Sequence, residues 1–181
     1  MHTILRLSKE RRSIRSYKPV KIDRSYLELC CDAGRHAPSA CDSQPWKFII
    51  VDDDTIRNRI DEAVFSGFYT LNSFARQAPA LIVQVSERIK ISAWIGGKLK
   101  NMDFRRIDTG IACSHIVLQA QELGLGTCIL GWFDEKKLKK ILQIPRSGKV
   151  ELVIAIGYQD KAPSREKMLK DRGKTLSLNK Y

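Results

Sequence analysis

Three arginines and a serine stand close together in the stretch RRSIRSY, residues 11–17. Arginine offers planar pairs of N–H donors that stay charged, and these suit phosphate oxygens. In an extended stretch alternate side chains share a side, so Arg11, Ser13 and Arg15 would converge while Arg12 points elsewhere. The residue types alone leave two interpretations open, a solvated basic patch and an anion-binding site.

A second stretch, APSACDSQPWKF over residues 37–48, combines two prolines with residues that favour turns. It predicts a rigid polar loop between a helix and a strand, and such loops often hold ligands. Ser39 and Gln44 can offer neutral hydrogen bonds to a heterocycle. An ordinary connection with Trp46 packed in the core explains the same residues.

A third stretch, ELGLGTCILGWF over residues 122–133, contains three glycines that allow close backbone approach or a positive φ. A helix stop and a strand bend account for Gly124 and Gly126. They explain Gly131 less well, and backbone N–H groups around Gly131 could face a flat ring.

The elements that must position these stretches follow from hydrophobic periodicity and from turn residues. Residues 104–123 predict the longest helix, which is apolar most of the way round and therefore suits a core or a subunit interface. No GxGxxG follows the first strand, which disfavours a Rossmann dinucleotide site. We expect helices at 3–10, between Asp23 and Pro38, at 54–64, 104–123 and 134–144, and strands at 46–52, 78–86, 126–132 and 150–158.

Helices and strands alternate irregularly, which predicts an α+β fold with a sheet flanked by helices. The 181 residues, 43% of them hydrophobic, are enough for a single domain over 1–181. Residues 159–181 are basic and lack apolar periodicity, so they are expected to form a surface arm. No apolar run has the length of a membrane span or of a signal-peptide core, and we expect a cytoplasmic protein.

The net charge of +12 raises the question of a nucleic-acid partner. The excess is spread out, and much of it lies in DEKKLKKILQ, where the lysines occupy the face opposite Leu138, Ile141 and Leu142. That pattern favours a solvated face over one that reads DNA, and an anionic ligand suits the charge equally well.

The five cysteines are odd in number and none forms a CxxC pair. A disulfide framework and a structural zinc site are therefore disfavoured, and no metal is expected. Buried thiols are the expected state, with Cys41 and Cys113 as candidates for lining a pocket.

Taken in order, the segments RRSIRSY, APSACDSQPWKFIIV, IDTGIACSHIVLQAQELGLGTCILGWF and IAIGY resemble the FMN-dependent nitroreductase family, from about Arg11 to Arg165. The resemblance implies a central, mostly antiparallel sheet, and homodimers that bind one FMN at each end of the subunit interface. The helix at 104–123 would form much of that interface. The implied reaction is ping-pong, in which NADH or NADPH reduces the flavin and a nitroaromatic, quinone or similar acceptor reoxidises it. It assigns no catalytic side chain, because solvent can supply protons.

Residue by residue, the resemblance implies that the basic stretch, Arg11, Arg12, Ser13 and Arg15, holds FMN. Arg11 and Ser13 are assigned to the phosphate and ribityl end. Arg15 is assigned to the N1/C2 edge of the flavin, where a cation stabilises the negatively charged reduced ring. Arg165 is a candidate second phosphate ligand.

The resemblance also implies that Pro38, Ser39 and Ala40 come from the partner subunit and cover the ring, with Asp42 and Gln44 in the same loop. The family often has asparagine where this chain has Asp42. An aspartate near a flavin disfavours the negatively charged reduced form unless the carboxylate is solvated or paired.

The segment Ile129, Leu130 and Gly131 would lie beside the ring, with the Gly131 amide near N5. Asn72 is a further candidate contact. Residues 66–103 are interpreted as a compact insert that forms a lid over the substrate side.

Three alternatives remain open from the sequence. The first is another reaction on the same fold, such as reductive dehalogenation or flavin fragmentation. The second is a flavin-binding protein without reductase turnover. The third is a nucleic-acid binder, which the charge suggests and the absence of a recognition motif disfavours.

Overall fold

Four antiparallel strands form a central sheet in the order β1-β2-β4-β3. The computed structural model describes residues 2–87, 102–161 and 167–181. The central strand β2 is buried at all seven positions, as its near-continuous apolar sequence predicts. The strands are β1 Trp46–Val51, β2 Ala80–Ser86, β3 Gly126–Leu130 and β4 Lys149–Gly157.

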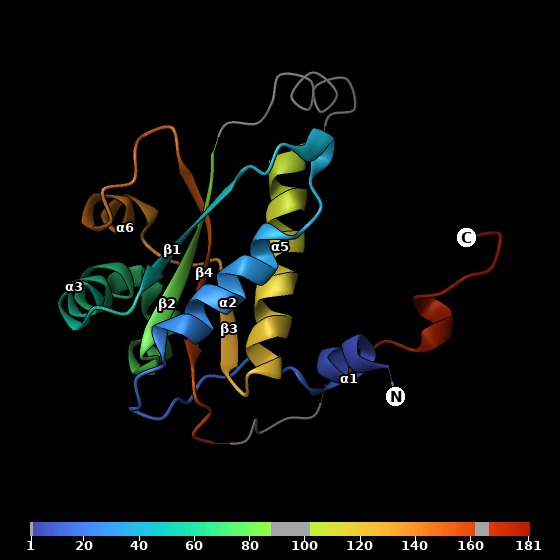
Figure 1. Cartoon of the computed structure of the whole chain (residues 1–181), viewed down its shortest axis with the longest axis horizontal. Coiled ribbons are helices and arrows are strands. Elements are labelled where there is room, and N and C mark those ends of the chain that lie inside the picture. The colour runs from blue at the N-terminus through green and yellow to red at the C-terminus, as the bar shows by residue number, and fades with distance from the viewer. Residues whose placement is uncertain (1, 88–101, 162–166) are drawn as a thin grey trace.

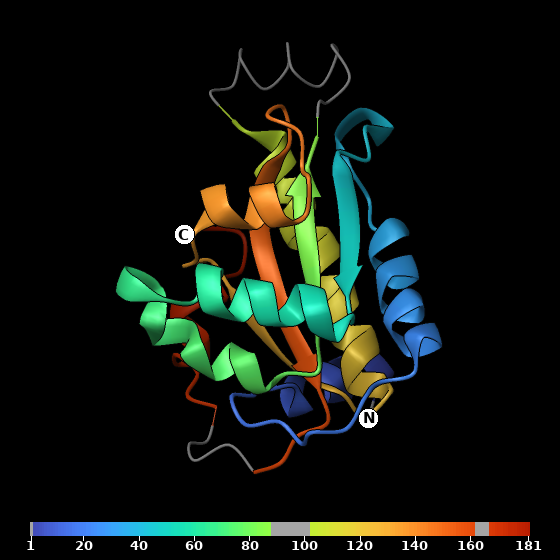
Figure 2. The same cartoon turned by 90° about the vertical axis from the view of Figure 1, so that its left-hand side faces the viewer.

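Helices cover both faces of this sheet (Figures 1 and 2). The pair α2 and α5 lies on one face, and the pair α3 and α6 lies on the other. The helices are α1 Thr3–Glu10, α2 Arg24–Arg35, α3 Asp54–Val64, α5 Phe104–Glu122 and α6 Glu135–Ile141, with 3-10 segments η1 Ala40–Asp42, η2 Gly67–Gln77 and η3 Arg172–Lys174. The α+β prediction is confirmed.

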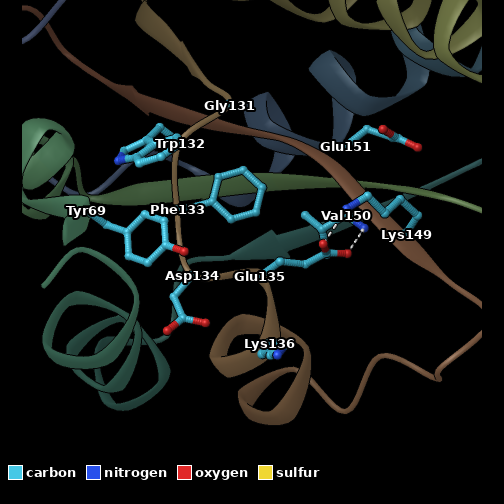
Figure 3. Close-up of a pocket in the computed structure, with 10 residues that line it drawn as sticks. All are labelled: Tyr69, Gly131, Trp132, Phe133, Asp134, Glu135, Lys136, Lys149, Val150 and Glu151. Atoms are coloured by element: carbon cyan, nitrogen blue, oxygen red, sulfur yellow. Dashed lines mark hydrogen bonds and ion pairs between the residues drawn. The ribbon is translucent and has the colours of Figure 1, made fainter. Parts of the chain in front are cut away.

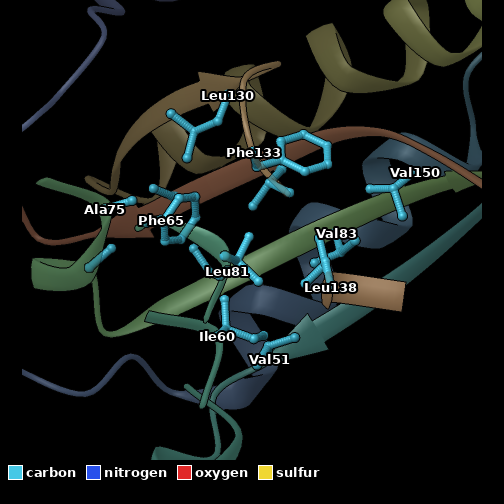
Figure 4. Packing of buried hydrophobic residues seen from close by; sticks show 14 of the residues in the cluster. Val51, Ile60, Phe65, Ala75, Leu81, Val83, Leu130, Phe133, Leu138 and Val150 are labelled. Atoms are coloured by element: carbon cyan, nitrogen blue, oxygen red, sulfur yellow. The ribbon is translucent and has the colours of Figure 1, made fainter. Parts of the chain in front are cut away.

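The two hydrophobic layers are separated by the alternation of side chains along β2. Leu81 and Val83 face α3 and α6 (Figure 4), where Leu138 is fully buried. Ile82 points to the opposite face, where it packs in the same cluster as Ile116 of α5. The sheet thus carries a core on each side.

The helix boundaries follow their capping residues. The Asp23 carboxylate accepts the Ser25 amide at 2.9 Å and starts α2. Gly124 has a φ of +74° just beyond α5, as expected of a glycine that ends a helix. The predicted length of 104–123 for α5 agrees with the observed helix within a residue.

The lid interpretation of residues 66–103 is wrong for its middle part. Ala80–Ser86 is the central strand β2, and residues 67–77 form η2 against the end of α3. The remaining stretch, 88–101, lies outside the described residues. The near-continuous apolar run at 78–86 is typical of a buried strand. A buried strand belongs to the core and therefore cannot be part of a lid.

The described residues also test the expectations for membranes and metals. No helix within 2–87, 102–161 or 167–181 has the length and apolarity to cross a bilayer. In the same ranges, no group of three or more histidine, cysteine, aspartate or glutamate side chains is arranged to hold a metal ion.

Candidate functional site

The arginine segment, residues 11–15, docks on the free edge of β3. Ser13 forms a parallel bridge with Thr127, and the Ile14 amide donates to the Thr127 carbonyl at 2.9 Å. Ile14 is buried over Gly126, where a Cβ would lie only 2.7 Å from Ile14 Cγ1. The glycine is therefore required for the segment to approach the strand this closely.

Tyr17 fixes the far end of the same segment. Its hydroxyl donates to the Ile14 carbonyl at 2.7 Å, and burial raises the pKa of this phenol far above its usual range. Tyr17 also bridges to Gln159, just beyond β4. The backbone that carries the arginines is thus held at two points by its own chain.

The basic side chains of the segment point in different directions. Arg12 Nη1 donates to the Lys9 carbonyl at 2.6 Å, so this side chain turns back toward the end of α1. The Arg15 guanidinium lies 5.6 Å from the centre of the Phe74 ring, a cation–π distance, and Ser13 is exposed. The expectation that Arg12 points away from its neighbours agrees with this geometry.

Arg11 interacts electrostatically with two buried thiols, Cys113 in the middle of α5 and Cys128 in β3. Burial raises the pKa of Cys113 to about 12, and the Arg11 charge acts in the opposite direction. Burial likewise raises the pKa of Cys128, which Arg15 and Arg11 both lower. These thiols stay protonated at neutral pH, and they belong to the hydrophobic clusters on opposite faces of the sheet.

The C-terminal arm brings a fourth cation to this place. Lys167 Nζ donates to the Ser8 carbonyl at 2.7 Å. Burial, followed by the positive charges of Arg11 and Arg12, lowers the pKa of Lys167. Lys167 is not among the site residues predicted from the sequence, although the basic composition of the arm was a signal. The predicted ligand Arg165 lies outside the described residues.

The segment that follows β3 is tied to η2. Asn72 Nδ2 donates to the Trp132 carbonyl at 2.7 Å, and Trp132 Nε1 donates to the Phe68 carbonyl at 3.0 Å. The rings of Tyr69 and Trp132 lie 5.4 Å apart at an interplanar angle of 48°. The Asn72 side chain is therefore bonded to the residue that follows Gly131, and its contact with a ligand stays a prediction.

A cavity of about 510 Å³ opens beside this segment (Figure 3). Its wall includes the aromatic rings of Tyr69, Trp132 and Phe133, and it also contains Gly131. A Cβ built on Gly131 meets nothing within 4 Å, so the space there is open. Such a volume with aromatic walls suits a flat organic molecule.

Three of the charged side chains in the cavity wall bond to other groups of the protein. The Lys149 ammonium pairs with the Glu135 carboxylate, and Ser86 Oγ donates to Glu151 at 2.7 Å. Ile129 and Leu130, also predicted to lie beside the flavin ring, differ in solvent exposure. The Leu130 side chain is buried in the core, whereas Ile129 is 42% exposed. Leu130 can therefore face a ligand only through its backbone.

The 38–44 loop does not meet the arginine segment within one chain. The Ala40 amide bonds to Asp108, near the start of α5, whereas Ile14 bonds to Thr127, just after the end of α5. A helix of 19 residues is about 28 Å long, so the two predicted halves of the site lie at opposite ends of α5 (Figure 1).

The 38–44 loop has an unusual backbone. Cys41, Asp42 and Gln44 have positive φ values of 52°, 50° and 45°. The Ser39 hydroxyl accepts the Gln44 amide at 2.9 Å, and Asp42 accepts from the Gln44 side chain at 2.7 Å. Cys41 is exposed, so the expectation of buried thiols is wrong here, whereas Cys30, Cys113 and Cys128 are buried.

Comparison with known proteins shows the family to which this chain belongs. The model of the nitroreductase family matches residues 8–71 and 68–158, which is most of the chain. This protein belongs to the nitroreductase family. The fold is therefore that of an oxidoreductase enzyme of this family.

Individual relatives of this nitroreductase-family chain agree on the fold and differ in their reactions. It is 32% identical to a putative NADH dehydrogenase/NAD(P)H nitroreductase of Archaeoglobus fulgidus, over 87% of this chain and 86% of the relative. An FMN-dependent nitroreductase structure from Clostridium difficile aligns with a TM-score of 0.75 and 30% identity, covering 97% of this chain and 98% of that one. An iodotyrosine deiodinase of Thermotoga neapolitana is 24% identical, over 88% of this chain and 90% of the relative.

Proposed function

We propose that this nitroreductase-family protein is a homodimeric FMN enzyme that uses NADH or NADPH to reduce nitroaromatics, quinones or similar small acceptors. The observation that carries the proposal is the basic segment bound to β3 through the Ile14–Thr127 hydrogen bond, with Lys167 bonded to the nearby Ser8 carbonyl and with open space at Gly131 just beyond the end of the same strand. A phosphate is the natural counterion for such a cluster, and a flat ring fits beside Gly131.

The residues present fit FMN by their chemistry. Charge-assisted donors for the phosphate come from Arg11 and Lys167, at the end of the site nearest α1. Arg15, held over the Phe74 ring, supplies positive charge for the pyrimidine edge of the flavin. Gly131 leaves room for the ring edge and offers its backbone amide.

When bound, FMN supplies reversible electron transfer between a reduced nicotinamide and an acceptor. The chain's own residues then have three tasks. The arginine segment holds the phosphate, and Arg15 stabilises negative charge that develops on the ring. The aromatic wall of Tyr69 and Trp132 orients a flat acceptor and keeps water away.

A dimer is required to complete this site. The 38–44 loop and the arginine segment lie at opposite ends of α5, so two antiparallel copies of α5 would place the loop of one subunit beside the arginines of the other. The exposed side of α5 offers a surface for that pairing, because Ile107 is 43% exposed and Gly110 has open space around it. We infer that the loop covers the flavin of the partner subunit.

The absorption spectrum of the purified protein tests the cofactor. We expect the two visible bands of an oxidised flavin, or their appearance with saturable FMN titration of protein obtained without flavin. Steady-state oxidation of NADH and NADPH with menadione or a nitrofuran then tests turnover. A colourless, monomeric protein that does not bind FMN would contradict the proposal, and FMN binding without turnover would favour a flavin-binding protein.

Reductive dehalogenation is the second candidate, because of the similarity to an iodotyrosine deiodinase. An amino-acid substrate needs charged partners for its ammonium and carboxylate groups. In the cavity wall Lys149 is paired with Glu135, and Glu151 accepts a hydrogen bond from Ser86. This pairing favours a neutral acceptor, and a direct comparison of iodotyrosine with a nitrofuran under reducing conditions distinguishes the two.

A further inference from the structure

Asp108 is a buried carboxylate near the start of α5. Its side chain belongs to a residue that is only 3% exposed, and both of its oxygens lie 3.2 Å from the Ala40 amide nitrogen. Burial raises the pKa of this carboxyl group, and the Ala40 amide opposes that shift. A carboxylate is costly to bury, so its retention here points to a specific role for the bond with the loop.

The loop that Asp108 binds is strained and internally bonded. Its three residues with positive φ are not glycines, and such a backbone persists only where the surroundings enforce it. Ser43 Oγ donates to the Ala40 carbonyl at 2.6 Å, and the Asp42 amide donates to the Ser39 carbonyl at 3.1 Å. These bonds hold the shape of the loop, but they do not set its position on the rest of the protein.

The bond with Asp108 connects this shaped loop to a rigid part of the fold. The next residue on α5, Thr109, accepts a hydrogen bond through its carbonyl from Gln84 Nε2 at 2.9 Å. Gln84 is fully buried in the central strand β2. The loop is therefore connected through Asp108 to the helix, and through Gln84 to the middle of the sheet.

We propose that Asp108 is a positioning residue that sets the height of the 38–44 loop on α5, so that the loop of each subunit covers the flavin of its partner. This proposal rests on the proposed function for the flavin and the dimer. Asp108 is not one of the residues predicted to contact the flavin. Its proposed role is to place Pro38, Ser39 and Ala40, which are.

Hydrogen exchange of the flavin-free protein tests the anchor independently of any activity. In Asp108→Ala, amides of residues 39–44 should exchange about 10- to 100-fold faster, as expected for loss of a hydrogen bond to a charged group. Asp108→Asn keeps an acceptor oxygen and should retain most of the protection. Unchanged exchange in Asp108→Ala would overturn the anchor.

Ala40→Pro removes the same bond from the loop side. Ser39 has φ −142° and ψ 154°, the extended conformation that a following proline favours, so the substitution fits the local backbone. It also serves as the deciding variant if Asp108→Ala does not fold. The double variant Ala40→Pro/Asp108→Ala should show no larger effect than either change alone.

FMN affinity and the visible circular dichroism of bound flavin test the positioning role. We expect Asp108→Ala and Ala40→Pro to weaken FMN binding about tenfold and to change the visible spectrum, while the dimer persists and Asp108→Asn stays near wild type. Faster exchange with unchanged affinity and spectrum would overturn the positioning role alone. Failure of the wild type to bind FMN would instead overturn the proposed function, and the exchange experiment would still decide the anchor.

Discussion

The arginine segment and the 38–44 loop are two halves of one proposed site, and they are held in opposite ways. The arginine segment pairs with β3 through Thr127 and buries Ile14, so its own chain determines its place. The loop has a strained backbone, forms several hydrogen bonds within itself and is bonded to the helix through Asp108. The arginine segment is proposed to bind the flavin of its own subunit, so it can lie on the sheet. The 38–44 loop is proposed to cover the flavin of the partner subunit, so it has to project from its own subunit.

The arginine segment and the 38–44 loop can form one site only if two subunits pair through α5. Gly110→Arg on α5 should abolish dimerisation and weaken FMN binding by about 30- to 1,000-fold, the effect of disrupting a central interface position. A Cβ at Gly110 meets nothing within 4 Å among the described residues, so we expect the fold to be retained. Size-exclusion chromatography and FMN titration measure the two effects.

Asn58→Arg is the matched control, because it adds the same charge to an exposed position of α3. It should leave the dimer and the FMN affinity unchanged. A Gly110→Arg protein that remains dimeric would show that the two halves meet in some other way.

Gly131→Val separates flavin chemistry from stability. The open space around Gly131 predicts an unchanged melting temperature, because an added Cβ meets nothing within 4 Å among the described residues. With FMN bound at this edge, displacement of the ring should lower the reduction rate about 100-fold. Stopped-flow reduction by NADH measures this rate, and normal turnover would place the ring elsewhere.

Arg11→Ala tests the arginine segment as the phosphate-binding half of the proposed site. Loss of one charge-assisted phosphate contact should cost about 1.5–3 kcal/mol, or about 10- to 150-fold in FMN affinity. Arg35→Ala is a suitable control, because Arg35 is an exposed arginine on α2 paired with Asp32 at 2.7 Å. Equal affinities in both variants would move the phosphate site away from the arginine segment.

Gly126→Val tests how the arginine segment is positioned. The added side chain would overlap Ile14, and such overpacking should lower the free energy of unfolding by about 1–3 kcal/mol. Denaturant titration measures this loss, and FMN affinity should fall with it. The compensating pair Gly126→Ala/Ile14→Ala should recover part of both quantities, and a lack of recovery would argue against the contact as the cause.

The smallest effect is expected at Asp42 in the loop. Asp42 is exposed and accepts a hydrogen bond from Gln44, so solvent and this partner weaken its influence. Asp42→Asn should raise the flavin midpoint potential by on the order of 10–20 mV, corresponding to about 0.5–1 kcal/mol for a two-electron couple. Redox titration would reveal a larger shift if the carboxylate lay directly against the ring.

Much of the fold was predictable because local chemistry and burial agree. Apolar periodicity located the helices, and the continuous apolar run of β2 identified the central strand. Asp23 and Gly124 marked helix ends through capping and a positive φ. The lid interpretation failed because it treated a segment around this strand as an insert.

The site was predictable only in part. Residue types and the family resemblance selected the arginines, Asn72 and Gly131 as candidates, and their contacts with a flavin stay predictions. Lys167 and Asp108 were missed, since a lysine in a basic arm and an aspartate on a helix have no distinguishing local pattern. Their roles come from neighbours that are more than 60 residues away in the chain.

The sequence by itself determined the α+β order of elements, the basic segment and the glycine that follows β3. The tertiary structure decided which of these lie together. It brought Lys167 to the arginines and separated the 38–44 loop from them by the length of α5. Local patterns specify periodicity and caps, whereas proximity between distant segments depends on how the whole core packs.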